Sequence, residues 1–138
     1  MPSLYFAYGS NLSLDQMRSR CADSRPVRSH YLDGHELTLR GVANIEDREG
    51  SRIPGAIYEI SQDDERRLDG FESWPNLYGK LFFETDLGTV MYYRLVEPKY
   101  IRPREGYVGI IATGYGDWGL PAEHLEAAIE AQRVRDGQ

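Results

Sequence analysis

The sequence has almost no cysteine and no excess of positive charge. Cys21 is the only cysteine, so the chain cannot form an internal disulfide. The 16 lysines and arginines are outnumbered by 22 acidic residues, and the net charge of -6 offers no basic face for nucleic acid or anionic lipid. No run reaches the roughly 20 apolar residues that a membrane span requires. We therefore expect a small-molecule or protein partner, with no nucleic acid and no membrane.

Repeats, low-complexity segments and a targeting segment are missing too. The N-terminal stretch MPSLYFAYG has neither the basic flank nor the apolar length of a signal peptide, so we expect a cytoplasmic protein. A chain of 138 residues, 41% of them hydrophobic, can bury a core without a metal or a disulfide. We expect residues 1–138 to form one domain that is a monomer or a weak homodimer.

Standard catalytic motifs are absent as well. The segment AYGSN does not match the nucleophile pattern G-x-S-x-G, and no glycine pattern of a phosphate-binding loop occurs. His30, His35 and His124 have no metal-ligand spacing with Cys21. We therefore expect no hydrolytic triad, no metal and no cofactor, and we interpret Cys21 as a small, partly buried filler.

Alternating apolar and polar residues predict several short strands. They lie before Gly9, at residues 35–41 and 55–60, and on both sides of a TDLG turn within residues 77–95. The polar segment 44–54 is interpreted as a surface turn that joins two strands of a hairpin. Six or so strands with hairpin spacing favour a mostly antiparallel sheet or a small barrel.

Capping patterns predict three helices. Ser13 and Ser61 are each followed three positions later by a residue that completes a capping box, and Gly70 follows the second helix as its C-terminal cap. Pro121 suits the first position of a last helix, whose buried face would carry Leu125, Ala128, Ile129 and Gln132. The fold class is therefore α+β, with helices packed outside the strands.

Glu72 is the candidate catalytic residue. It lies two residues beyond Gly70, between Phe71 and a Ser-Trp-Pro turn. A partly desolvated carboxylate beside the negative end of a helix has a raised pKa, which suits a general base near neutral pH. The alternative is an exposed loop carboxylate paired with Arg66 or Lys80, and the spacing alone leaves both interpretations open.

Two stretches together resemble the γ-glutamylcyclotransferases and their γ-glutamylamine and AIG2-like relatives. The first is YFAYGSNL, residues 5–12, and the second is LDGFE, which ends at Glu72 and is followed by Tyr78. A weaker match is GYGDWGLPAEHLEAAI, residues 114–129. The resemblance implies a small mixed, mostly antiparallel β-barrel with flanking helices, in which the turn after the first strand and Glu72 face one pocket.

The resemblance also implies a reaction without a cofactor. A γ-glutamyl amide would be converted into 5-oxoproline and a free amine or amino acid, with Glu72 as the general acid and base. The substrate's own α-amine would be the nucleophile, which explains the missing catalytic motifs. The implied substrate-binding residues are Tyr8, Gly9, Ser10, Asn11, Leu12, Tyr78, Tyr93 and Tyr107.

The leaving group and two other functions stay open. The YGSN turn resembles the branch that acts on γ-glutamyl-amino acids, whereas FESWPNLYGK resembles the branch that acts on γ-glutamylamines. A non-catalytic module of the same fold that binds a small ligand is the main alternative. A third interpretation makes Ser10 an amidase nucleophile, but no histidine is placed by the sequence to activate it.

Overall fold

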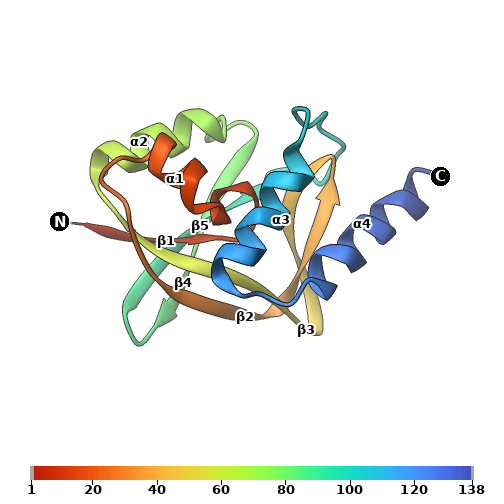
Figure 1. The fold of residues 1–138 in the computed structure, drawn as a ribbon, viewed down its shortest axis with the longest axis horizontal. Coiled ribbons are helices and arrows are strands. Elements are labelled where there is room, and N and C mark those ends of the chain that lie inside the picture. The colour runs from red at the N-terminus through yellow and green to blue at the C-terminus, as the bar shows by residue number, and fades with distance from the viewer. Residues whose placement is uncertain (1, 138) are drawn as a thin grey trace.

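A curved sheet with helices outside it forms the framework of the computed structural model, which describes residues 2–137 (Figure 1). Its strands lie in the order β2-β3-β1-β5-β4, and only the pair β1 and β5 is parallel. The strand bounds are Ser3–Ala7 for β1, Arg25–Arg40 for β2, Val42–Ile60 for β3, Tyr78–Thr85 for β4 and Gly88–Leu95 for β5.

This arrangement confirms the α+β class and the mostly antiparallel pairing. The prediction of a barrel was only loosely right, because no ladder within residues 2–137 joins the edge strands β2 and β4. The structure also has five strands in this range in place of the six or so expected. Two long strands replace several short ones, since β2 and β3 span 16 and 19 residues.

The segment 44–54 is not a turn, and that prediction was wrong. It lies within β3, and the chain reverses at Gly41, whose neighbours Arg40 and Val42 are paired across the hairpin. Gly41 has a φ of +77°, a left-handed conformation that favours glycine. Gly50 and most of the polar residues belong to an exposed part of β3. This part lies opposite the point in β2 where the register shifts, between Asp33 and His35. Because this part of β3 is exposed to solvent, its residues are polar, and a polar segment with a glycine resembles a turn in sequence.

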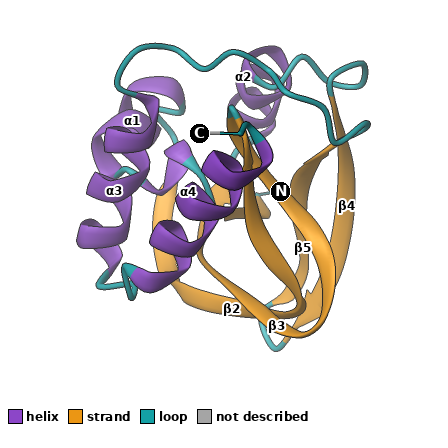
Figure 2. Ribbon diagram, turned by 90° about the vertical axis from the view of Figure 1, so that its right-hand side faces the viewer, coloured by secondary structure: helices purple, strands orange, loops and turns teal. Residues whose placement is uncertain are grey.

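The helices cover one side of the strands (Figure 2). A 3₁₀ turn, η1, follows the first strand, α3 packs against η1, and α4 packs against β2. No helix within residues 2–137 is long and apolar enough to cross a membrane. The helix bounds are Ser10–Leu12 for η1, Leu14–Arg20 for α1, Gln62–Phe71 for α2, Tyr107–Trp118 for α3 and Glu123–Arg135 for α4.

The first two helix starts are confirmed by their caps. The Ser13 hydroxyl accepts a hydrogen bond from Gln16 N at 3.2 Å, and Ser61 and Asp64 form a complete capping box. The last helix begins later than expected, because its first residue is Glu123 and not Pro121. Helix α3 was missed by the sequence analysis.

Candidate active site

A cavity of about 220 Å³ lies between the end of the first strand and the C-terminal end of α2. Seven parts of the chain contribute to its lining: β1 with the turn after it, the end of α1, the start of β3, the end of α2, β4, β5, and the segment from β5 to the first residue of α3. The lining residues that the sequence analysis named as site residues are Tyr8, Gly9, Ser10, Asn11, Glu72, Tyr78, Tyr93 and Tyr107.

Leu12 does not line this cavity, contrary to expectation. Its side chain is fully buried in the core, with 0% exposure. Its carbonyl oxygen accepts hydrogen bonds from Trp118 Nε1 at 2.9 Å and from the Tyr58 hydroxyl at 3.3 Å. The side chain of Leu12 therefore points away from the cavity, and its carbonyl group anchors the turn to the core and to α3.

The turn after β1 presents backbone to the cavity. A Cβ added at Gly9 would lie 2.9 Å from Cβ of Ala43, so a larger residue would force β3 away. Within residues 2–137 the N–H groups of Gly9, Ser10 and Asn11 have no hydrogen-bond acceptor. Unpaired backbone N–H groups beside a cavity are donors available to a ligand oxygen.

Side chains of the turn are held by Gln16 and Arg20 of helix α1. Gln16 Nε2 donates to Ser10 Oγ at 2.8 Å and to Asn11 Oδ1 at 3.0 Å. Arg20 also donates to Asn11 Oδ1, at 3.2 Å, while Asn11 Nδ2 donates to the Tyr5 hydroxyl at 3.0 Å. Because Ser10 Oγ is an acceptor in this network, its own hydrogen is free to donate to a ligand.

Glu72 caps the C-terminal end of α2, where its N–H donates to Leu68 O at 2.9 Å. Its side chain is partly buried in the wall of the cavity and has no hydrogen bond or ion pair with any residue from 2 to 137. Arg66 and Lys80, the ion-pair partners of Glu72 in the alternative interpretation, are paired elsewhere. Arg66 pairs with Asp63, and Lys80 pairs with acidic residues of α2. The carboxylate is therefore available to a ligand.

The environment of Glu72 favours the protonated form. Burial raises the pKa of Glu72 from its ordinary value of 4.5 to about 7, and the positive charge of Arg20 opposes the shift. A carboxyl group with a pKa near neutrality can both accept and return a proton. Among the residues that line the cavity, Glu72 is the one carboxylate, and none of them is a histidine or a cysteine.

The four predicted pocket tyrosines make hydrogen bonds to the protein. Tyr8 donates to the Tyr93 carbonyl at 2.6 Å, and Tyr78 donates to the Ala43 carbonyl at 2.7 Å. Tyr107 differs, because its hydroxyl oxygen accepts the Ala43 N–H at 2.8 Å and keeps its hydrogen free. Burial raises the pKa of Tyr107 to about 12, so this hydroxyl is a neutral donor. These tyrosines shape the cavity more than they offer free polar groups.

Tyr93 belongs to a second polar network behind the cavity. Its hydroxyl donates to Asp69 Oδ1 at 2.6 Å, and Asp69 also pairs with Lys80 at 2.9 Å. The Lys80 ammonium lies 4.1 Å from the centre of the Trp74 ring, which is a cation–π distance. This network ties β5 and β4 to the segment that follows Glu72.

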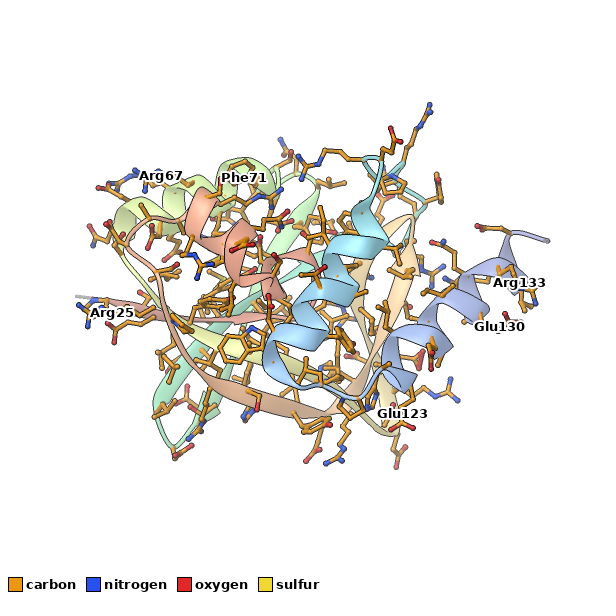
Figure 3. The ribbon with its side chains drawn as sticks, viewed as in Figure 1. Arg25, Arg67, Phe71, Glu123, Glu130 and Arg133 are labelled. Carbon is orange, nitrogen blue, oxygen red and sulfur yellow. The ribbon has the colours of Figure 1, made fainter. Side chains whose placement is uncertain are left out.

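Several lining residues were not named as site residues by the sequence analysis. Arg20 is half-buried and lies 4.2 Å above the centre of the Phe71 ring, which projects at the end of α2 (Figure 3). Arg102 and Arg104 come from the segment between β5 and α3, which has no regular structure. The sequence signal was weak, because an arginine in the last turn of a helix is a common exposed residue. Others in this group are Tyr5, Val42, Ala43, Leu77, Ile101 and Pro103.

No group of three or more histidine, cysteine, aspartate or glutamate residues in the described range is placed to hold a metal ion. Cys21 lies outside the cavity and is fully buried, and burial raises the pKa of its thiol to about 12. Its interpretation as a packing residue agrees with this position.

This fold and pocket define a small α+β protein whose cavity presents unpaired backbone N–H groups and one carboxylate. Residues 5–118 match the family model described as "Gamma-glutamyl cyclotransferase, AIG2-like", and the chain belongs to this family. The predicted resemblance is therefore confirmed. A search of curated proteins gave no significant match.

Solved structures share the fold. One, titled "Gamma-glutamyl cyclotransferase", is 24% identical, with 93% of this chain and 86% of that chain covered and a TM-score of 0.73. The human protein loc79017 is 24% identical over 92% of this chain and 86% of its own, with a TM-score of 0.74. YkqA from Bacillus subtilis is 21% identical, covers 94% of this chain and 54% of its own, and has a TM-score of 0.68.

Proposed function

We propose that the protein converts a γ-glutamyl amide into 5-oxoproline and a free amine, with Glu72 as general acid and base. The substrate would be a γ-glutamyl-amino acid or a γ-glutamylamine. The observation that carries the proposal is the unpaired Glu72 carboxylate, which faces the cavity with a pKa raised to about 7 by burial. Membership of the γ-glutamyl cyclotransferase family supports it.

The first step is a proton transfer from the substrate to Glu72. The α-ammonium of the γ-glutamyl group loses a proton to the carboxylate and becomes a free amine. This nitrogen attacks the γ-carbonyl carbon and forms the ring C–N bond of the lactam. The reaction needs no protein nucleophile, because nitrogen and carbonyl belong to one molecule and attack within a five-membered ring has a high effective concentration.

The second step breaks the original amide bond. As the tetrahedral intermediate collapses, its oxygen re-forms the carbonyl and the leaving nitrogen takes the proton held by Glu72. The ring nitrogen, which carries an extra proton after the attack, releases it to solvent. The carboxylate is then ready for another cycle, and the products are 5-oxoproline and a neutral amine, which takes up a proton from solvent. One group with a pKa near neutrality suits both transfers.

Charged and polar groups around Glu72 would hold the substrate during these steps. The turn N–H groups of Gly9, Ser10 and Asn11 would stabilise the oxyanion that develops on the γ-carbonyl oxygen. Arg20, whose charge already influences Glu72, would bind the α-carboxylate on the same carbon as the reacting amine. The free hydrogen of the Ser10 hydroxyl is a further donor to a substrate oxygen.

The proposal is tested by product analysis. The protein is incubated with a panel of γ-glutamyl-amino acids and γ-glutamylamines, and 5-oxoproline, free amine and glutamate are quantified. Equal amounts of 5-oxoproline and amine support the proposal. Release of glutamate in place of 5-oxoproline would indicate hydrolysis, as expected if Ser10 were a nucleophile. Binding of the panel without turnover would favour the non-catalytic module.

A further inference from the structure

The lining of the active-site cavity carries the opposite charge to the molecule as a whole. The chain has a net charge of -6. The cavity, however, is lined by three arginines and a single carboxylate, that of Glu72. The three arginines are Arg20, Arg102 and Arg104. A concave site of one sign of charge in a molecule of the other sign selects ligands by their charge.

The arginines differ in depth. Arg20 is half-buried and is fixed by Asn11 on one side and by the Phe71 ring on the other. Arg102 and Arg104 are exposed, so they lie at the rim of the cavity, farther from its floor. Within residues 2–137 neither rim arginine has an ion pair or a hydrogen bond of its side chain. Their charges are therefore available to a bound molecule.

The backbone that carries the rim arginines is held in place. Ile101 N donates to Arg40 O at 2.8 Å, and a Cβ at Gly41 would lie only 1.9 Å from Ile101 O. At the other end, Tyr107 N donates to Arg104 O at 3.1 Å as α3 begins. Figure 1 shows this teal segment passing between the far end of β2 and α3. An exposed segment anchored at both ends presents its side chains at a defined place.

Electrostatics at the rim favour an anion. Arg20 and Arg104 line the same cavity, where burial lowers the pKa of Arg20 and the positive charge of Arg104 lowers it further. A carboxylate bound near them relieves this repulsion, and guanidinium groups hold carboxylates through paired hydrogen bonds. An amine with a cationic tail would add to the repulsion, and an uncharged amine would leave it unrelieved.

We infer that Arg102 and Arg104 bind a carboxylate of the leaving group, so that the preferred substrates are γ-glutamyl-α-amino acids and not γ-glutamylamines that lack an acidic group. This inference rests on the proposed function, in which Arg20 and Glu72 hold the γ-glutamyl part at the inner end of the cavity. The amide bond then directs the leaving group toward the rim. The inference therefore favours the branch that acts on γ-glutamyl-amino acids over the branch that acts on γ-glutamylamines, a choice that the sequence motifs left open.

The test compares three substrates that differ only at the leaving group: γ-glutamyl-alanine, its C-terminal amide γ-glutamyl-alaninamide, and γ-glutamylethylamine, which lacks the carboxylate. We expect kcat/KM of the native protein to be at least about tenfold higher for γ-glutamyl-alanine than for the other two, the effect of one charged hydrogen-bonding pair. In the double variant Arg102→Gln/Arg104→Gln this preference should disappear. Its kcat/KM for γ-glutamylethylamine should stay within about twofold of native.

The control is Arg25→Gln, which removes one positive charge from an exposed position near the N-terminal end of the molecule, outside the cavity (Figure 3). It should leave the preference unchanged. Native protein that cyclises all three substrates equally would overturn the inference while the proposed function stands. So would a double variant that loses activity on all three alike.

A binding measurement separates the inference from the chemistry. Calorimetry with Glu72→Gln, which is expected to bind without turnover, compares γ-glutamyl-alanine with γ-glutamyl-alaninamide. Tighter binding of the acid, lost when Arg102 and Arg104 are also changed to Gln, supports the rim site even if no substrate yields 5-oxoproline. Equal affinities for acid and amide would overturn it.

Discussion

Arg20 donates a hydrogen bond to Asn11 Oδ1 at 3.2 Å and so joins the end of α1 to the turn after the first strand. The same guanidinium stacks on Phe71 and lowers the pKa of Glu72 against the effect of burial. One side chain therefore links the backbone donors of the turn to the candidate base. In the proposed function, this link holds the cation for the α-carboxylate and the base for the α-ammonium in one cavity.

The first prediction concerns Glu72→Gln, which keeps the shape of the side chain but cannot accept a proton from an ammonium group. Turnover should fall by about 10²–10⁴-fold, the usual loss for a general acid or base, while the affinity for a γ-glutamyl ligand changes much less. Steady-state rates of 5-oxoproline release and ligand binding by calorimetry measure the two effects.

The matched control is Glu49→Gln, at an exposed position of β3 outside the cavity, which should retain native turnover. Near-normal turnover of Glu72→Gln on a substrate that the native protein cyclises well would remove Glu72 from the mechanism.

The second prediction is the pH dependence of the reaction. The base must be ionised in the free enzyme, and burial raises the pKa of Glu72 to about 7. The value of kcat/KM should therefore rise with pH through about 7 and not through the ordinary glutamate range near 4.5. The residual activity of Glu72→Gln should not show this rise of kcat/KM with pH. A native profile that is flat between pH 5 and 8 would contradict the assignment.

The third prediction concerns stability, because a raised pKa couples folding to pH. The folded protein binds the Glu72 proton more tightly than the unfolded chain, with a pKa of about 7 against 4.5. The contribution of this group is fully present below pH 4.5 and is lost as the pH rises through about 7. The substitution Glu72→Gln removes this loss, so the variant should gain Tm relative to native protein at pH 8 but not at pH 4.5. Thermal unfolding at both pH values measures the difference, and a gain that is equal at both would point to a cause other than ionisation.

The sequence was sufficient where local chemistry dictates structure. The cap at Ser13 and the capping box at Ser61 fix helix starts within a few residues, and the turn residues of the TDLG hairpin connect β4 and β5 as expected. The pattern failed in segment 44–54, because its middle, residues 47–52, is mostly exposed and so lacks the apolar alternation that marks a half-buried strand.

The candidate site was predictable in part for a related reason. Glu72 and the turn at Gly9 each have a local signature, a carboxylate beside a helix end and a small-residue break after a strand. Arg104 has no such signature, because its role depends on the anchoring of its segment to Gly41, some sixty residues away in the sequence. Long-range contacts of this kind are not encoded in any short window.

The last prediction is that Ser10 binds substrate and does not attack it. Ser10 Oγ accepts a hydrogen bond from Gln16 Nε2 at 2.8 Å, and no histidine lines the cavity to remove its proton. Ser10→Ala should therefore remove one side-chain donor and leave the backbone N–H groups in place. We expect a loss of about 1–3 kcal/mol in substrate binding, seen mainly as a higher KM with little change in kcat. Ser51→Ala, a change of the same size on β3 away from the cavity, serves as the control and should alter neither constant. Mass spectrometry of native protein quenched during turnover provides the opposite test, because a glutamyl adduct on Ser10 would show that the hydroxyl is a nucleophile.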